Sequence, residues 1–355
     1  MKTRVCRLYG KGDIRIEEME VAEPGPGEVL VAMGAGGICG SDLHYYQDGG
    51  FGPIRVREPI ILGHEVAGTV KAVGEGVDTL SPGDRVAVNP SRPCHRCRYC
   101  LEGLQQHCLT MRFFGSALRF PHEQGGFRDL MVVDAYQCVP VTNEEVSLAE
   151  AACAEPLAVC LHALNRAGAM AGNLAGKSVL VTGAGPIGAL IVAALRHAGA
   201  GHIVVTDLQD RPLDIARQMG ADETVNVLSE GERLEAYAAD KGTFDIAFEC
   251  SAAAPAIKSA VAATRPQGAL VAVGVAGDVP VPLNMIVGKE IAFVGTHRFT
   301  SEYTQAVGLI DARRIDVRPI ISATSDLDDV TTAFALAGDR SKAVKVQLSF
   351  AASAR

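Results

Sequence analysis

Residues 1–150 contain short stretches in which hydrophobic and polar residues alternate, and turn residues separate these stretches. An alternation with a period of two is typical of strands that have one buried face. The clearest examples are residues 29–33, 66–73 and 85–89, and the clearest turns are 24–27 (PGPG) and 82–84 (PGD). Gly, Pro and Asp at such positions favour tight turns. The first part of the chain is therefore predicted to be rich in β-structure.

From about residue 151 the pattern changes to a repeated unit of apolar strand, glycine turn and helix. Strands that are almost continuously hydrophobic indicate a parallel sheet with helices on both faces. The predicted strands are 178–182, 203–206, 244–249, 269–273 and 291–294, and predicted helices end at 197 and span 211–219. After about residue 291 the pattern loosens, and the last sixty-odd residues are expected to return to the first domain.

These patterns predict an α/β protein with two domains, which a length of 355 residues can accommodate. Residues 1–150 are assigned to the β-rich domain. Residues 151–290 are assigned to a doubly wound, Rossmann-type parallel-sheet domain. Residues 291–355 are assigned to the return into the first domain.

Charge and composition exclude several classes of partner. The formal net charge is −8 and no long basic run occurs, which argues against binding to nucleic acid or to an anionic membrane. The N-terminal residues lack the apolar region of a signal peptide. The most apolar segment, residues 187–195, is too short to span a bilayer. A cytoplasmic, soluble enzyme is therefore expected.

Four of the ten cysteines stand close together as Cys94, Cys97, Cys100 and Cys108, in the pattern C-x2-C-x2-C-x7-C. Four thiolates on one short irregular loop suit the closed tetrahedral shell of a structural Zn²⁺ ion. Disulfides would need an oxidising compartment, which nothing in the chain indicates, and an iron–sulfur cluster uses similar spacings. A four-thiolate shell leaves no position for a substrate, so the chemistry must lie elsewhere.

A dinucleotide site is predicted at the turn after the strand 178–182. The turn carries G-x-G-x-x-G as Gly183, Gly185 and Gly188, with Pro186 and Ile187 opening the following helix. Such glycines permit the turn, the approach of a pyrophosphate and close packing of helix on strand. Asp207 ends the next strand, where a carboxylate can bind the adenosine ribose hydroxyls and repel a 2′-phosphate. NAD is therefore preferred, although nearby Arg211 leaves NADP possible. The alternative is a glycine turn that binds nothing.

A second metal site is suggested by Cys39, His64 and Glu65. A thiolate, an imidazole and a carboxylate are credible ligands for a catalytic zinc that keeps one open position. The spacing alone does not establish the site, because Cys39 is far from His64 in the sequence. A buried cysteine and a hydrogen-bonded core histidine remain the alternative.

Residues 63–68 (GHEVAG), with Gly74 and Val77, resemble the signature of zinc-containing alcohol dehydrogenases. With the four-cysteine loop and the glycine turn, this resemblance covers essentially the whole chain. The chain thus resembles the medium-chain zinc dehydrogenases, which implies a GroES-like catalytic domain. Similarity to the sorbitol dehydrogenase branch is carried by residues 39–45 (CGSDLHY) and 155–157 (EPL). Similarity to the L-idonate 5-dehydrogenases is carried by segments 111–117, 120–122, 125–127 and 298–302.

The resemblance implies roles for individual residues. Cys39 and His64 would be zinc ligands, with either Glu65 or Glu155 as a direct ligand and the other carboxylate in the site. Asp42 would orient His64. Ser41 would accept the proton of the zinc-bound alcohol, and His44 would pass it to solvent. Tyr45 and Arg298 would contact the substrate, with Arg112 and His122 as further cations or polar groups nearby.

The implied activity is a reversible, NAD(P)-dependent oxidation of L-idonate to 5-keto-D-gluconate, with two zinc ions per chain. A sorbitol or xylitol dehydrogenase is the alternative within the family. A non-enzymatic NAD-sensing scaffold is a different class, although such a protein would be expected to have lost metal ligands. Relatives are dimers or tetramers joined at sheet edges, and residues 279–287 are a candidate interface or a core strand.

Overall fold

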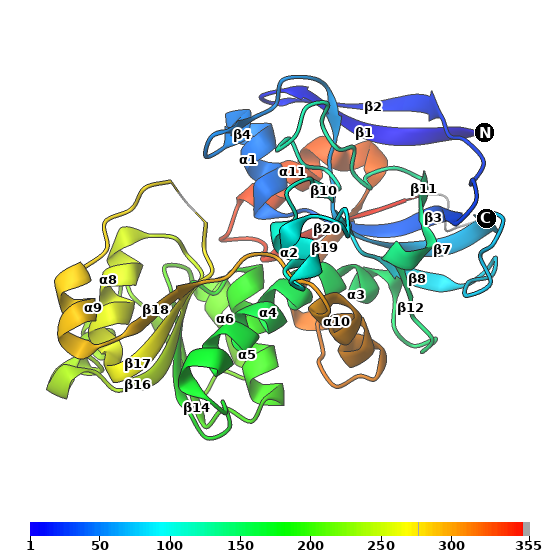
Figure 1. Cartoon of the computed structure of the whole chain (residues 1–355). Helices are drawn as coiled ribbons and strands as arrows, with labels where there is room; N and C mark the ends of the chain where they lie inside the picture. Colours follow the sequence, from blue (N-terminus) through cyan, green and yellow to red (C-terminus); the bar gives the residue numbers. More distant parts are fainter. Residues whose placement is uncertain (276, 351–355) are drawn as a thin grey trace.

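The computed structural model describes residues 1–275 and 277–350, which form two parts (Figure 1). We call residues 1–153 and 296–350 the β-rich part, and residues 154–295 the parallel-sheet part. Antiparallel sheets precede residue 151 and a parallel sheet follows it, so we propose the first domain boundary near this residue.

The β-rich part is built around a seven-stranded sheet. Its order is β12-β8-β7-β3-β20-β19, and β11 also pairs with β3. A smaller sheet, β2-β1-β6, lies beside it. The strands are β1 (Lys2–Gly10), β2 (Asp13–Glu20), β3 (Glu28–Gly37), β6 (Ile60–Ile61), β7 (Glu65–Val73), β8 (Arg85–Val88), β11 (Leu130–Asp134), β12 (Cys138–Pro140), β19 (Ile321–Asp326) and β20 (Lys345–Ser349).

Shorter elements complete this part. Helix α1 (Gly40–Asp48) follows β3 directly, and α11 (Val330–Gly338) packs on β20. The remaining elements are β4 (Gly50–Phe51), β5 (Ile54–Arg55), β9 (Ser91–Arg92), α2 (Arg98–Leu101), β10 (Arg112–Phe113), α3 (Leu148–Ala152) and α10 (Glu302–Asp311).

The parallel-sheet part has six strands in the order β15-β14-β13-β16-β17-β18, and every pair is parallel. Along β13, Val179 and Val181 pack into one hydrophobic cluster with α4 and α5, whereas Leu180 packs into another with α8 and α9. This alternation confirms that helices cover both faces. The strands are β13 (Ser178–Thr182), β14 (His202–Asp207), β15 (Glu223–Asn226), β16 (Phe244–Glu249), β17 (Thr264–Ala272) and β18 (Ala292–Gly295), and the helices are α4 (Ala154–Ala171), α5 (Pro186–His197), α6 (Asp210–Gln218), α7 (Gly231–Ala236), α8 (Ala254–Ala263) and α9 (Leu283–Lys289).

Two details differ from the sequence prediction. Strand β18 is the sixth strand of the parallel sheet, so this sheet continues beyond residue 290. We therefore propose that the second domain boundary follows β18. Segment 279–287 contains the start of α9, so the core-strand alternative is wrong, and Leu283 and Val287 on this helix are exposed.

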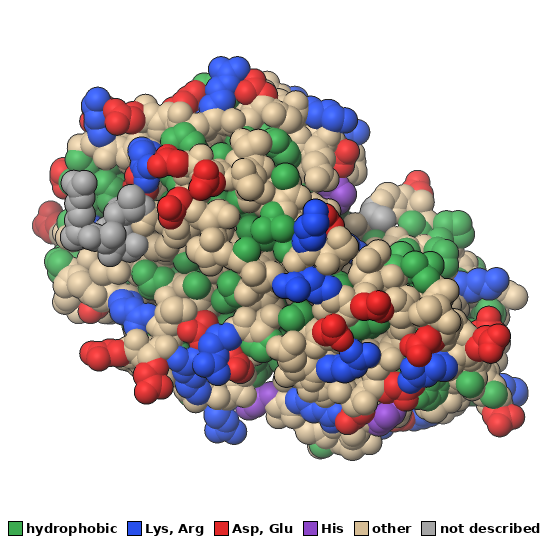
Figure 2. Space-filling model, turned by 180° about the vertical axis from the view of Figure 1, so that it is seen from behind, with side chains coloured by type: hydrophobic (Ala, Val, Ile, Leu, Met, Phe, Trp, Pro, Cys, Tyr) green, Lys and Arg blue, Asp and Glu red, His purple; other side chains and the backbone are tan. Residues whose placement is uncertain are grey.

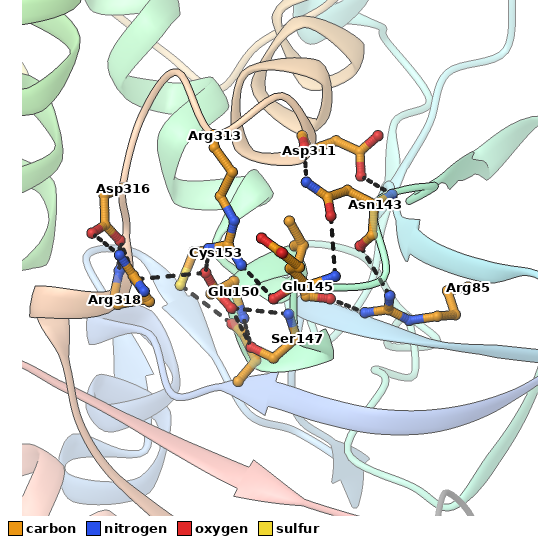
Figure 3. Close-up of polar contacts among 12 residues, drawn as sticks. Arg85, Asn143, Glu145, Ser147, Glu150, Cys153, Asp311, Arg313, Asp316 and Arg318 are labelled. Atoms are coloured by element: carbon orange, nitrogen blue, oxygen red, sulfur yellow. Dashed lines mark hydrogen bonds and ion pairs between the residues drawn. The ribbon is translucent and has the colours of Figure 1, made fainter.

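The chain crosses between the two parts after α3 and after β18, and polar contacts join the region of α3 to the C-terminal end of α10 (Figure 3). Glu150 in α3 accepts hydrogen bonds from Ser147, at 2.9 Å from the backbone nitrogen and 2.7 Å from Oγ, and pairs with Arg313. The Asp311 carboxylate accepts a 2.9 Å bond from the backbone nitrogen of Asn143. These contacts fix α3 immediately before the N-terminus of α4, where Glu155 lies.

The surface carries charges of both signs. On the face shown in Figure 2, Lys and Arg side chains alternate with Asp and Glu over both parts, and hydrophobic side chains lie between them. Within the described residues, no helix is both long and apolar enough to cross a membrane.

Candidate active site and metal centres

The four cysteines of the loop after β9 converge, and their sulfur atoms all lie within 4.8 Å of one another. Backbone N–H groups donate to this cluster, from Cys97 to Cys94 Sγ at 3.3 Å and from Cys94 to Cys108 Sγ at 3.2 Å. The backbone N–H of Arg96 is the main cause of a Cys94 pKa lowered to about 5. All ten cysteines are free thiols, so the cluster can offer four thiolates to one metal ion.

Cys39, His64 and Glu65 form the second cluster, again with ligand atoms within 4.8 Å of one another. Cys39 is the N-cap of α1, and Glu65 is the first residue of β7. Because β3 and β7 pair with Gly37 opposite Glu65, the sheet brings the end of β3 to the beginning of β7. The predicted thiolate, imidazole and carboxylate are therefore adjacent in the structure.

Asp42 connects the two chain segments that supply these groups. Its fully buried carboxylate accepts hydrogen bonds from the backbone nitrogens of Cys39 at 3.0 Å and Gly63 at 3.4 Å. Its Oδ1 lies 3.8 Å from Nδ1 of His64. A carboxylate beside the free nitrogen of a ligand histidine orients the ring and fixes its tautomer. The expected role of Asp42 thus matches its position.

Lys345 is a functional candidate that the sequence reasoning missed. Its Nζ lies 2.8 and 2.7 Å from the two carboxylate oxygens of Glu65, and both side chains are only 2% exposed. Burial lowers the pKa of Lys345, but Glu65 and Cys39 raise it more, so that the net pKa is above its usual value. The sequence signals this ion pair only through a lysine at the start of strand β20, which also contains the polar residues Gln347 and Ser349.

Space for the Glu65 carboxylate is provided by Gly37. A Cβ atom at position 37 would lie 2.0 Å from Glu65 Oε2, so any side chain there would displace the carboxylate. This glycine was also missed, because its role depends on the pairing of β3 with β7.

Glu155 lies in the first turn of α4 and is also buried. It is not among the three groups whose ligand atoms converge within 4.8 Å. Burial raises its pKa to about 7, while the charges of His64, Lys345 and Arg298 act in the opposite direction. The charges of the site therefore act on Glu155. Direct ligation of a metal by Glu65 or by Glu155 stays a prediction.

Ser41 and His44 lie on successive turns of α1. Ser41 is half-buried near Cys39, whereas His44 is exposed and its Nδ1 lies 3.1 Å from Oδ2 of Asp48. His44 lines a cavity whose opposite wall includes Ser251 and Val275 of the parallel-sheet part. A proton that left Ser41 towards His44 would thus move from a half-buried position to the solvent.

The two residues predicted to contact the substrate differ in whether they have hydrogen-bond partners within the protein. Tyr45 is buried, and its hydroxyl oxygen accepts a 3.2 Å hydrogen bond from the backbone nitrogen of Ala117. Arg298 has a left-handed backbone conformation, with φ 52°, and its guanidinium lies 4.2 Å from the ring centroid of Phe113. Arg298 makes no hydrogen bond or ion pair with any described residue.

Arg112 and His122 have other partners. Nε of Arg112 donates to Glu123 at 2.7 Å, and Nε2 of His122 accepts from the backbone nitrogen of Arg57 at 2.9 Å. Both line a separate cavity that contains none of the metal-site residues.

The glycine turn has the geometry that dinucleotide binding requires. Gly183 adopts φ 88°, and a Cβ at Gly188 would lie 1.8 Å from the carbonyl oxygen of Gly183, so the helix packs closely on the turn. At Gly185, the N-cap of α5, a Cβ would meet nothing within 4 Å. Pro186 and Ile187 follow in the first turn. The helix N-terminus is therefore open to an anion.

Asp207 lies at the predicted position beside this turn. Its carboxylate accepts hydrogen bonds from the backbone nitrogens of Ala184 at 2.7 Å, Leu208 at 2.7 Å and Gln209 at 3.1 Å. It lines a cavity of about 480 Å³ together with Gly183 and residues of α7 and α8. Arg211 is exposed on α6 and does not line this cavity.

Comparisons with known proteins agree with this geometry. Residues 25–143 match the alcohol dehydrogenase GroES-like domain, and residues 186–312 match the zinc-binding dehydrogenase domain. The chain belongs to the zinc-binding medium-chain dehydrogenase family. The two clusters are thus the structural four-cysteine site and the catalytic Cys/His/Glu site of a zinc-dependent dehydrogenase.

Within the family, the chain is 41% identical to L-idonate 5-dehydrogenase (NAD(P)(+)) of Escherichia coli K12, over 99% of both chains. The crystal structure of the L-idonate 5-dehydrogenase from E. coli K-12 superposes with a TM-score of 0.93, again covering 99% of both chains. The chain is 35% identical to sorbitol dehydrogenase of Gallus gallus, over 96% of this chain and 94% of the relative. An alcohol dehydrogenase from E. coli CFT073, solved in complex with NADH, has a TM-score of 0.87 at 28% identity and covers 98% of this chain and 99% of its own.

Proposed function

We propose that this dehydrogenase oxidises a secondary hydroxyl group of a sugar acid, with L-idonate as the first candidate. A hydride would pass from C5 of L-idonate to the nicotinamide of NAD(P)⁺, and the hydroxyl proton would pass to solvent. The products would be 5-keto-D-gluconate and NAD(P)H, and the reaction is reversible. The E. coli relative that is 41% identical over the full length supports this choice.

The unpaired Arg298 is the observation that carries the substrate class. Burial lowers its pKa, whereas Glu155 and Tyr45 act to raise it, so the guanidinium lies within electrostatic reach of both. A half-buried cation that forms no direct ion pair with a described carboxylate is costly unless another anion binds it. The planar guanidinium suits a bidentate contact with a carboxylate. A sugar acid supplies that carboxylate, and a neutral polyol does not.

The cysteine lobe, by which we mean residues 94–113, supports the segment that carries Arg298. The Arg298 guanidinium stacks on Phe113 of β10, and the ring of His297 stacks on that of His107 at 5.8 Å. Next to Arg298, buried Phe299 lines a cavity with Met111 and other residues of the lobe. We infer that the lobe holds Arg298 in place, which gives the structural metal an indirect influence on substrate binding.

The metal sites would each hold one zinc ion. Cys39 and His64, with Glu65 or Glu155, would hold the catalytic ion, which when bound acidifies the substrate hydroxyl. Cys94, Cys97, Cys100 and Cys108 would hold the structural ion. Ser41 would accept the hydroxyl proton, and the nicotinamide ribose and His44 would carry it to solvent.

NAD is the preferred cofactor in this proposal. The Asp207 carboxylate, which three backbone N–H groups hold in place, would bind the ribose hydroxyls and repel a 2′-phosphate. Arg211 is exposed and does not line the cavity, so its contribution to the binding of NADP would be small.

A substrate panel tests the proposal. The zinc-loaded enzyme should oxidise L-idonate with a higher kcat/KM than sorbitol or xylitol, and NAD⁺ should be used better than NADP⁺. In Arg298→Met, KM for L-idonate should rise about tenfold or more, the size of one lost charge-assisted contact, while KM for a neutral diol stays close to wild type. Arg119→Met is the matched control, because Arg119 is exposed and, among the described residues, its side chain hydrogen-bonds only the carbonyl of Thr110. Efficient oxidation of sorbitol without activity on L-idonate would contradict the proposal.

The second candidate substrate is a neutral polyol such as sorbitol or xylitol. The 35% identical sorbitol dehydrogenase favours it, and the metal site and proton path would serve equally well. In that case Arg298→Met would change KM for all substrates to a similar extent.

We also propose a homodimer or homotetramer. Strand β18 is the edge of the parallel sheet, Phe293 on it is 40% exposed, and Leu283 and Val287 of α9 are 67% and 69% exposed. An edge strand with exposed apolar residues favours pairing with a second copy. Sedimentation of the wild type and of Phe293→Glu would test this interface.

A further inference from the structure

Two cavities lie end to end between the parts of the molecule. The first, beside Asp207, is lined by residues 182–262 of the parallel-sheet part and, from the β-rich part, by Arg340 alone. The second is lined by residues 44–55 on one side, by residues 251, 252, 275 and 277 on the other, and again by Arg340. The residues common to both cavities are Ser251 and Arg340.

A bound dinucleotide would have to pass between these two residues. Its adenosine belongs at Asp207, in the first cavity. Its nicotinamide must reach the substrate beside Ser41, and the second cavity, lined by His44, leads in that direction. The pyrophosphate joins the two nucleosides and carries two negative charges. Its expected position is therefore at the junction, where the glycine turn approaches from the parallel-sheet part and Arg340 from the β-rich part.

Arg340 is available for such a contact. It is exposed, and it makes no hydrogen bond or ion pair within the described residues. The neighbouring Asp339 does not neutralise it, because that carboxylate binds Ser341 Oγ at 2.6 Å and Lys342 Nζ at 2.9 Å. Arg55, the other arginine of the second cavity, already donates to the carbonyls of Gly52 and Ile54 in its own hairpin.

The loop of Arg340 is also positioned by the helix that carries the proposed proton path. At Gly338, which ends α11, a Cβ atom would lie 2.8 Å from Nε2 of Gln47 in α1. Since α1 also bears Ser41 and His44, the loop of Arg340 lies close to the helix that carries the proposed proton path.

We propose that Arg340 binds the pyrophosphate of the dinucleotide from the β-rich side of the cleft, opposite the glycine turn of residues 183–188. The proposal rests on the cofactor part of the proposed function and is independent of the substrate. An exposed arginine is usually only solvated, but a solvated surface residue has no reason to line both halves of a cofactor cleft. Charge-assisted contacts from Arg to phosphate are among the stronger polar interactions in proteins.

The test measures binding of NADH and NADPH to the full-length, zinc-loaded enzyme by nicotinamide fluorescence, without substrate. In Arg340→Gln, Kd should rise about tenfold or more for both nucleotides, which is the size expected for one lost charge-assisted contact. The salt dependence of binding should become weaker, and the affinity for adenosine, measured by competition, should not change. Arg340→Lys should recover part of the affinity.

Lys342→Gln is the matched control, because this lysine is on the same loop, is exposed, pairs with Asp339 and lines neither cavity. An unchanged Kd for NADH in Arg340→Gln would overturn the proposal. A loss confined to NADPH would assign Arg340 to the 2′-phosphate, and an equal loss for adenosine would show a general distortion of the site, so both results would overturn it as well. Failure of the wild type to bind either nucleotide would instead refute the cofactor part of the proposed function.

Discussion

The two metal clusters have the same compactness but opposite construction. The four-cysteine site takes all its ligands from residues 94–108, and its polar support comes mainly from backbone N–H groups of the same loop. The Cys39, His64 and Glu65 site depends on distant segments, because Asp42 joins α1 to β7 and Lys345 arrives from β20 at the other end of the chain. The first site is thus a local structure, and the second is a product of the whole β-rich sheet.

The two metal sites are also expected to differ in how much they contribute to the stability of the fold. The cysteine lobe lies on an irregular loop where Leu101 and Leu109 are 75% and 63% exposed, and it reaches the main hydrophobic core through a few residues such as Cys100 and Cys108. The Glu65–Lys345 pair is almost completely buried, and removal of one partner would leave an uncompensated charge in the interior. We therefore expect changes at the first site to affect mainly the lobe, and changes at the second to affect both catalysis and global stability.

The largest effect is expected from Cys39→Ser. Loss of a catalytic ligand should lower kcat/KM about 10³-fold or more, because a metal contributes several kcal/mol to stabilisation of a developing alkoxide. Bound zinc should fall from two ions per chain to one, and the thermal midpoint should fall as well, because a bound metal stabilises the folded state. Metal analysis and steady-state kinetics measure both quantities. Retention of two zinc ions with normal activity would remove Cys39 from the ligand set.

Lys345→Met should come next, with a decrease of about 3–5 kcal/mol in the free energy of unfolding, since Glu65 would remain buried and unpaired. Denaturant unfolding measures this change. Lys342→Met is the control, since that exposed pair is expected to contribute at most about 1 kcal/mol. The double variant Glu65→Gln/Lys345→Met should recover stability relative to Lys345→Met. Equal stability of Lys345→Met and Lys342→Met would show that the buried ion pair contributes no more than the exposed one. That result would contradict the expected energetic difference between the two metal sites.

Ser41→Ala should lower kcat by about 10²-fold, the contribution expected of one general acid–base group. Zinc content and NADH affinity should match the wild type, since Ser41 is in neither ligand set. The pH dependence of kcat should change as well, because the proton would have to leave by another path. A wild-type pH profile in this variant would exclude Ser41 from the proton path.

Cys97→Ser should have the smallest effect on chemistry, with kcat lowered less than about tenfold, because the altered shell does not touch the reacting atoms. One zinc ion per chain should be lost, and limited proteolysis should cut the lobe faster. KM for L-idonate should rise moderately if the lobe holds Arg298 through Phe113 and His107. A collapse of global stability would show that the lobe is less local than its geometry indicates.

Much of the fold follows from local patterns in the sequence. The apolar strands 178–182 and 244–249 coincide with β13 and β16, and the expected helix 211–219 differs from α6 by one residue at each end. Residues 291–294 were predicted as a strand, and β18 is found there. The short, half-exposed β18 still left the domain boundary near residue 290 poorly defined, because the pattern loosens from this point on. Arg298 was the first choice for a substrate contact, and Arg112 and His122 were further candidates. Only the structure shows that Arg112 and His122 already have protein partners.

The sequence by itself determined what depends on near neighbours along the chain. The spacing of four cysteines, the glycines of the dinucleotide turn and the carboxylate of Asp207 all act over a few residues or between adjacent strands. Tertiary structure alone decided that Lys345 neutralises Glu65, that Gly37 makes room for this carboxylate, and that Arg340 lines both cavities of the cofactor cleft. The physical reason is that strand pairing and the contact of two domains join residues hundreds of positions apart, and no local pattern of hydrophobic or polar residues records such a contact.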